Sequence, residues 1–266
     1  MYEAAVGPED ATLAFAGDVT LAEAKAQAER AFGDWKGRQR PFTAVAAPAA
    51  PDAARPRIVL VERPGATQSQ VAVTLVGVPR KSPDFEAILV MNSILGAQFS
   101  SRLNMNLREK HAYTYGARSG FDMRLGPGPF TAGGAIEARH TAAAVKEILA
   151  EIERMRREPV TAAELSTAQQ YLVRQLPARF ETARETASTS AALSLYDLPL
   201  DEFAGRAARI EKVTAADVQR VAERTLVDGG RFVVVVGPPE VRDGLAALGL
   251  GEVEVRRPGT PPPAKR

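Results

Sequence analysis

Strands are indicated in this sequence by short runs in which β-branched and other apolar residues recur or alternate with polar ones. Two such runs, residues 57–63 (RIVLVER) and 67–79 (TQSQVAVTLVGVP), lie on either side of a Pro-Gly turn. The run at 231–237 (RFVVVVG) is apolar almost throughout and is typical of a central strand. Two further strands are predicted at 113–124 and 129–138, joined by a Gly-Pro-Gly turn.

Two helices are predicted between these strands from apolar spacing and from the residues at their starts. Ser82, followed by a proline and an acidic turn, begins a helix that is apolar on most sides and ends at Gly96. Because it has no polar face, this helix is expected to be buried. A second helix places Phe99, Leu103 and Leu107 on one side.

The second half of the chain is predicted to be mostly helical. An apolar stripe runs along residues 140–158, and capping boxes at 161–164 (TAAE) and 214–217 (TAAD) begin two further helices. Pro177 is expected to kink the first of these without ending it, because the helical pattern continues to about Leu198. Strands first and helices later, with hairpin connections, indicate an α+β fold in which helices cover a mixed or antiparallel sheet.

Two low-complexity segments divide the chain. Residues 41–56 are rich in alanine and proline and are predicted to form an extended linker. Residues 257–266 are predicted to form a disordered, proline-rich tail. The body between them, residues 57–256, is interpreted as one complete domain.

An internal likeness suggests how the N-terminal segment arose. Residues 12–35 repeat the strand, glycine turn and helix order of residues 231–249. We therefore interpret residues 1–40 as the strand–helix tail of an earlier, similar domain. Because strand–turn–helix units are common, a coincidental likeness is the alternative. On the first interpretation the strand TLAFA (12–16) lacks its sheet, and we expect it to dock elsewhere on the chain or pair with another copy.

Composition and charge exclude some functional classes and give no support for others. Lys and Arg total 34 against 32 Asp and Glu, a net charge of +2 that gives no support for nucleic-acid binding. The chain has no cysteine, which excludes disulfides, Cys-ligated zinc, iron–sulfur clusters and thiol nucleophiles. No apolar run reaches the roughly 18 residues of a membrane helix. A soluble chain is predicted, with the compartment, cytoplasmic or periplasmic, left open.

The sequence lacks the motifs of the common catalytic centres. His111 and His140, the two histidines, fit neither order of the paired-histidine zinc motif and are interpreted as surface or cap residues. Nucleotide-binding glycine loops and the G-x-S-x-G nucleophile elbow do not occur either. Acidic pairs one helical turn apart, such as Glu147 and Glu151, are interpreted as solvated helix faces.

A polar cluster at a helix-to-strand corner is the remaining candidate site. Within SRLNMNLREKHAYTYGARSGF (101–121), Arg108 lies near the end of the predicted helix, and Tyr113 and Tyr115 begin the next strand. Spacing alone leaves two interpretations open. Either Arg108 pairs with a local acid such as Glu109 and the tyrosines pack on a half-buried strand, or the corner presents hydrogen-bond donors to a docked molecule.

The order of these parts resembles the pitrilysin/insulysin/mitochondrial-processing-peptidase family of inverted-zincin metalloendopeptidases. The likeness extends from about Tyr2 to Glu240. The motifs that carry this likeness most specifically are Gly-Asp-Val and Phe-Gly-Asp-Trp near the N-terminus. The others are S-R-L…L-R-E-K…Y-x-Y in the middle of the chain and F-V-V-V-V-G near its end. The resemblance implies two homologous α+β domains around an enclosed chamber, with this chain supplying the complete C-terminal domain, which does not bind zinc.

The resemblance also implies roles for the cluster. Arg108 and Tyr115 match, in spacing and context, the arginine and tyrosine with which such a C-terminal domain faces the metal. They are expected to stabilise the transition state at the substrate carbonyl, and Tyr113 is expected to contact the bound peptide. The sequence departs from the family pattern at His111-Ala112, where many relatives have a small residue such as glycine.

Cofactor and partner expectations follow from the same resemblance. No cofactor is expected on this chain, and zinc is expected in the N-terminal domain or in a partner subunit. The expected partners are a peptide or protein substrate, the homologous zinc-bearing domain or subunit, and, as a further arrangement, a second copy in a homodimer. The alternative function is a catalytically inactive structural or partner subunit of the same fold.

Overall fold

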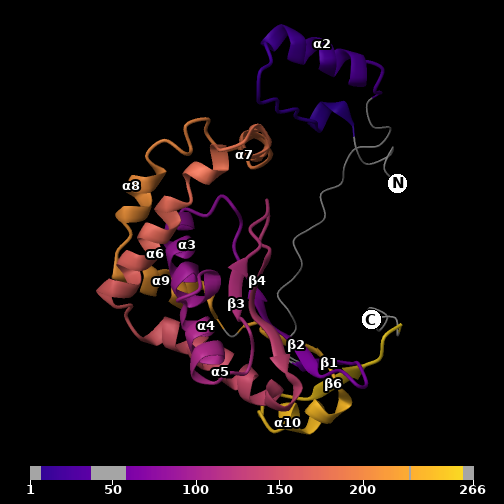
Figure 1. Cartoon of the computed structure of the whole chain (residues 1–266), viewed down its shortest axis with the longest axis vertical. Helices are drawn as coiled ribbons and strands as arrows, with labels where there is room; N and C mark the ends of the chain where they lie inside the picture. The colour runs from indigo at the N-terminus through magenta and orange to yellow at the C-terminus, as the bar shows by residue number, and fades with distance from the viewer. Residues whose placement is uncertain (1–6, 37–57, 228, 260–266) are drawn as a thin grey trace. The chain divides into compact units, whose positions relative to one another are not determined.

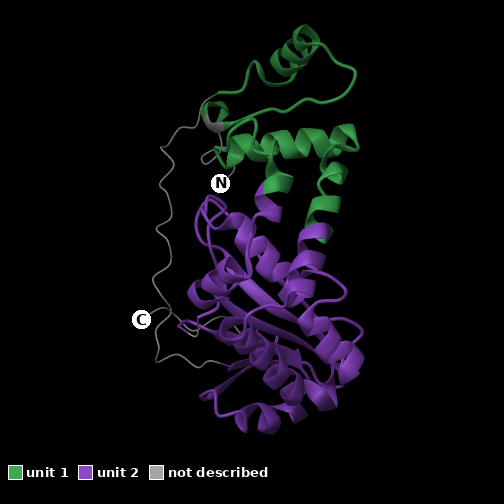
Figure 2. Ribbon diagram, turned by 90° about the vertical axis from the view of Figure 1, so that its left-hand side faces the viewer, with its two compact units in different colours: residues 1–47, 171–208 green, residues 48–170, 209–266 purple. Residues whose placement is uncertain are grey.

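The structure of the chain is a computed structural model that describes residues 7–36, 58–227 and 229–259 (Figure 1). The predicted linker at 41–56 and most of the predicted tail therefore lie outside the described residues. The chain divides into two compact units (Figure 2). Unit 1 comprises residues 1–47 and 171–208, and unit 2 comprises residues 48–170 and 209–266.

Unit 2 is built on a six-stranded mixed sheet with the strand order β3-β4-β2-β5-β1-β6. The strands are β1 (Ile58–Glu62), β2 (Gln68–Val76), β3 (Arg118–Phe121), β4 (Pro129–Glu137), β5 (Phe232–Gly237) and β6 (Val253–Arg256). β1 runs parallel to β5 and β6, while the β2–β5, β2–β4 and β3–β4 pairs are antiparallel. The predicted central strand is confirmed, whereas β6 has no counterpart among the predicted strands.

Alternation along the strands gives the sheet one buried face. In β2 the buried positions are every second residue from Ser69 to Leu75, and in β5 Val233 and Val235 are buried. Helices α3 (Phe85–Asn92) and α5 (Thr141–Arg157) lie against the strands, and α9 (Ala215–Thr225) packs against both of these helices (Figure 1). The predicted α+β architecture, a mixed sheet with helices, is therefore confirmed.

The remaining helices and turns are distributed over both units. They are α2 (Leu21–Phe32), α4 (Arg102–Asn104), α6 (Ala162–Arg174), α7 (Ala183–Leu195), α8 (Arg206–Glu211), α10 (Arg242–Ala246), the 3-10 turns η1 (Pro8–Asp10), η4 (Ala138–His140), η5 (Pro177–Phe180) and η6 (Pro239–Val241), and the π-helical turns η2 (Ser93–Ala97) and η3 (Met105–Lys110). Both predicted capping boxes are present, since the hydroxyls of Thr161 and Thr214 accept hydrogen bonds from Glu164 and Asp217 backbone N–H groups, each at 3.2 Å.

The first predicted helix differs from expectation at both ends. It begins at Phe85, because the Ser82 hydroxyl accepts from the Asp84 N–H at 3.3 Å and so closes a turn before the helix starts. At its other end α3 widens into η2, so Gly96 does not stop the helix. A Cβ at position 96 would collide with Ser119 of β3. Glycine is needed there for close approach of the helix to the sheet.

The predicted continuation of a single helix through Pro177 is wrong. α6 ends at Arg174, a 3-10 turn follows at Pro177, and α7 begins afresh at Ala183. Proline has no N–H to offer the preceding turn. In addition, the Thr182 hydroxyl accepts a hydrogen bond from the Glu185 N–H at 3.2 Å, which caps a new helix.

In unit 1 the predicted helix forms but the predicted strand at 12–16 does not. α2 begins at a complete capping box formed by Thr20 and Glu23. Residues 11–16 have no strand pairing within the described chain, and the Thr12 hydroxyl hydrogen-bonds instead to that of Ser194 in α7 at 2.9 Å. Residues 12–15 and the end of α7 line a cavity of about 420 Å³. A strand requires a partner strand, whereas a capped helix is largely a local structure.

Candidate active site

The candidate site lies where η3 ends and the chain turns towards β3. Leu103 and Leu107 are fully buried, which fixes one side of α4 and η3 against the core. The N–H of His111 donates to the carbonyl of Asn106 at 3.1 Å, and Ala112 then adopts a left-handed conformation with φ of 53°. This conformation reverses the chain direction at a position where glycine is the residue of lowest strain.

Arg108 projects from η3 into partly solvated surroundings. Its side chain is 39% exposed, and its Nε lies 3.3 Å from Oε1 of the neighbouring Glu109. The guanidinium also stacks over the ring of Phe99, with Cζ 4.7 Å from the ring centroid. Ion pairs between exposed groups contribute little, so the pair with Glu109 leaves the guanidinium available to a ligand.

The two tyrosines occupy different environments and lie before the strand, which begins only at Arg118. The Thr114 hydroxyl donates to the carbonyls of Ala135 at 2.6 Å and Gly116 at 3.0 Å, forming a side-chain-bonded turn where a strand was predicted. Tyr115 is 90% exposed, whereas Tyr113 is half-buried. Of the two interpretations that spacing left open, the first holds for the pairing of Arg108 with Glu109 and for the half-buried Tyr113, but not for Tyr115.

Asn104 joins the two parts of the candidate site. Its Nδ2 donates to the carbonyl of Phe99 at 2.8 Å, and its Oδ1 accepts from the N–H of Ala117 at 3.3 Å. Phe99 carries the ring under Arg108, and Ala117 follows two residues after Tyr115. A single buried amide thus connects the loop that supports Arg108 to the turn that presents Tyr115.

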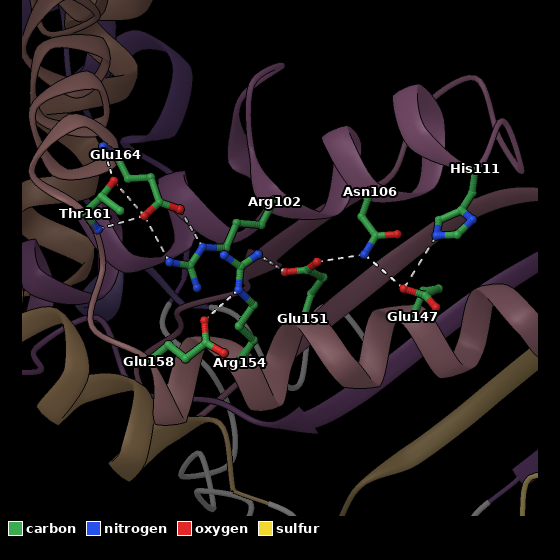
Figure 3. A network of polar contacts seen from close by, with 9 residues as sticks. All are labelled: Arg102, Asn106, His111, Glu147, Glu151, Arg154, Glu158, Thr161 and Glu164. Atoms are coloured by element: carbon green, nitrogen blue, oxygen red, sulfur yellow. Dashed lines mark hydrogen bonds and ion pairs between the residues drawn. The ribbon is translucent and has the colours of Figure 1, made fainter.

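Polar contacts under the site join η3 to α5 and α4 to the start of α6 (Figure 3). Asn106 donates to Oε2 of Glu147 at 3.0 Å and to Oε1 of Glu151 at 2.7 Å. Glu151 is buried and its other oxygen lies 3.6 Å from a guanidinium nitrogen of Arg154. The interpretation of Glu147 and Glu151 as a solvated face is therefore wrong for Glu151. The one-turn spacing of Glu147 and Glu151 does not predict that Asn106 covers Glu151.

Arg102 and Glu164 form the strongest ion pair of this network. The Arg102 side chain is 6% exposed and contacts both carboxylate oxygens of Glu164, at 2.6 and 3.0 Å. Partial burial raises the pKa of Glu164, but the hydrogen bonds from Arg102 and Thr161 outweigh it and lower that pKa from 4.5 to about 2. Glu164 is thus an ionised group that anchors the start of α6.

The described residues contain no cluster of three or more histidine and carboxylate side chains that could hold a metal ion. Over the same residues, no helix is both long and apolar enough to cross a membrane. The chemistry that this site offers consists of hydrogen-bond donors: the guanidinium of Arg108 and the phenol of Tyr115.

Comparison with protein families gives one match. Residues 1–172 match the model described as the peptidase M16 inactive domain. The chain belongs to the peptidase M16 inactive domain family. No sequence among curated proteins matches it.

Solved structures show the same fold as this M16 inactive domain. The peptidase M16 inactive domain from Pseudomonas fluorescens has a TM-score of 0.73 at 24% identity, over 84% of this chain and 52% of that one. A protease from Helicobacter pylori has a TM-score of 0.70 at 22% identity, over 84% and 54%. The periplasmic protease PqqL from Escherichia coli has a TM-score of 0.63 at 18% identity, over 84% and 24%. The chain thus spans about half the length of the first two structures.

Proposed function

We propose that this chain is the C-terminal, non-zinc-binding half of a zinc metalloendopeptidase. Its role is to bind peptide substrate and to stabilise the transition state, with zinc held by a homologous domain or partner subunit. The observation that supports this proposal most is the 90% exposure of the Tyr115 side chain on a turn whose backbone is tightly hydrogen-bonded. A solvated aromatic ring on a fixed turn has no role in the packing of unit 2.

The proposed chemistry follows from the side chains. A zinc ion held by the homologous domain or subunit would supply the activation of the attacking water. Attack on a peptide carbonyl places negative charge on the carbonyl oxygen. Arg108 and Tyr115 would donate hydrogen bonds to that oxygen, and both side-chain types keep their protons near neutral pH. Losing one preorganised donor of this kind costs about 3–4 kcal/mol of transition-state stabilisation. Donors placed on a separate domain would also make turnover depend on closure around the substrate.

The test uses the chain assembled with its zinc-bearing domain or subunit. Tyr115→Phe removes only the phenol hydroxyl, and we expect it to lower kcat roughly 100-fold while zinc content stays at the wild-type level. Tyr171→Phe, in α6, is the matched control for loss of a tyrosine hydroxyl. Unchanged kcat in Tyr115→Phe would remove Tyr115 from the proposed mechanism.

A second candidate function is a structural or partner subunit that keeps the fold without taking part in chemistry. One observation favours it: Arg108 already has an acidic neighbour in Glu109. This alternative predicts that assembly with the zinc-bearing partner is retained while Arg108 and Tyr115 variants leave turnover unchanged. Peptide hydrolysis by the assembled wild-type and variant proteins separates the two functions.

A further inference from the structure

The two histidines of the chain both stack on the same tyrosine. The ring centroids of His111 and Tyr113 are 4.9 Å apart at an interplanar angle of 21°. Those of Tyr113 and His140 are 4.5 Å apart at 24°. His111 comes from the end of η3 and His140 from the start of α5, so the stack joins two segments that are distant in sequence. We call these three residues the His–Tyr–His stack.

Each end of the stack lies close to a carboxylate. Nε2 of His111 is 3.8 Å from Oε2 of Glu147, the oxygen that also accepts a hydrogen bond from Asn106. Nε2 of His140 is 3.7 Å from Oε2 of Glu137 at the end of β4. The imidazole of His111 therefore lies beside α5, and that of His140 lies beside the end of β4.

The backbone around Tyr113 is restrained as well. Its N–H donates to the carbonyl of Leu107 at 2.9 Å, and its carbonyl accepts from the N–H of Glu137 at 2.9 Å. Thr114 then bonds to Ala135, as described above. All of these contacts hold the residues immediately before Tyr115, whose own side chain extends into solvent.

We propose that Tyr113 is a positioning residue: its ring, stacked with His111 and with His140, fixes the turn that presents Tyr115. This inference rests on the proposed function of Tyr115. It differs from the peptide contact predicted for Tyr113, because it gives the ring two imidazoles of the chain itself as stacking partners. On this proposal the aromatic ring of Tyr113 is required to hold the turn, and its hydroxyl is not.

The stack can be tested on the chain itself, without any activity measurement. Because the sequence has only two histidines, a histidine-labelled sample gives one set of imidazole NMR signals from each ring of the stack. We expect both sets to be shifted upfield by the tyrosine ring current, to stay shifted in Tyr113→Phe, and to return towards free-histidine values in Tyr113→Leu. Tyr196→Leu, at the end of α7, controls for loss of a tyrosine. Signals that do not respond to Tyr113→Leu would overturn the inference.

The positioning role is tested in the assembled, zinc-containing protein. We expect Tyr113→Leu to lower kcat roughly 10- to 100-fold, as a displaced catalytic group does, with KM changed much less. Tyr113→Phe should recover most of the lost kcat, because it restores the ring. A Tyr113→Phe variant as impaired as Tyr113→Leu would overturn the inference by showing that the hydroxyl acts directly.

Two further outcomes separate this inference from the proposed function. If Tyr115→Phe and Arg108→Ala both leave kcat unchanged, the proposed function fails whatever the histidine signals show. If Tyr115→Phe lowers kcat but Tyr113→Leu does not, the proposed function stands and the positioning role of Tyr113 is wrong.

Discussion

Arg102 and Arg108 lie six residues apart on one continuous helical segment, yet their environments are opposite. The Arg102 side chain is 6% exposed and makes two hydrogen bonds to Glu164. The Arg108 side chain is 39% exposed and is supported by a ring and by one loosely placed carboxylate. An arginine fixed by protein partners therefore serves stability, whereas one left partly unsatisfied at a rigid site is available for a ligand.

The largest expected stability effect is at the buried arginine. Arg102→Met leaves Glu164 without its main partner, and we expect it to lower the free energy of unfolding by about 3 kcal/mol, the low end for a broken buried pair. Arg108→Met, the matched control, should change it by less than about 0.5 kcal/mol, as exposed substitutions do. Denaturant unfolding of both variants measures the difference, and equal losses would abolish the contrast between the two arginines.

Removing both members of the buried pair should recover part of that loss. In Arg102→Met with Glu164→Leu no unpaired charge remains, and well-packed apolar replacements of buried ion pairs are often near neutral. Some loss will persist because Glu164 also completes the capping box with Thr161, and a lost cap costs about 1 kcal/mol. We therefore expect the double variant to unfold at a higher denaturant concentration than Arg102→Met. A double variant that is less stable than Arg102→Met would show that the pair is not the reason for the single variant's loss.

The Arg102–Glu164 pair also predicts that the free energy of unfolding decreases at acid pH. The pKa of Glu164 is lowered in the folded state from 4.5 to about 2, so its ionised form favours folding. This contribution is fully present above about pH 4.5 and is lost as the pH falls towards 2. Unfolding of wild type and of the double variant across this range should show a smaller pH dependence in the double variant. If the free energy of unfolding depends on pH equally in wild type and in the double variant, Glu164 is not the cause of the loss of stability at acid pH.

The smallest expected effect is at the turn after Arg108. Ala112 has a φ of 53°, and replacing it with glycine should relieve strain and stabilise the chain by about 0.5–1 kcal/mol. Asp197→Gly, at the other described non-glycine residue with positive φ, is the control and should gain less, because aspartate tolerates this conformation better. Thermal unfolding distinguishes the two, and destabilisation by Ala112→Gly would show that the alanine side chain is needed there.

Local signals in the sequence were sufficient for much of the fold. The boxes at Thr161 and Thr214 complete their hydrogen bonds within four residues, so both helix starts are predicted correctly. The strand at 12–16 depends on a distant partner strand and does not form among the described residues. Thr182 carries a helix-capping signal that could have located the break near Pro177.

In the candidate site, too, some features could be predicted from the sequence and others could not. The family resemblance selects Arg108 and Tyr115, which spacing alone does not, and both side chains reach solvent in the structure. The stacking of His140 on Tyr113 and the burial of Glu151 depend on how α5 packs against η3. Neither contact has a short-range pattern in the sequence, and only the folded chain brings these residues together.

The most direct test of the central claim is the turnover of Arg108→Ala in the assembled, zinc-containing protein, measured at a temperature where the variant is fully folded. The account predicts a fall in kcat of roughly 100- to 1,000-fold, with zinc content and unfolding free energy close to wild type. A variant that binds zinc, folds normally and hydrolyses peptide at the wild-type rate would contradict it.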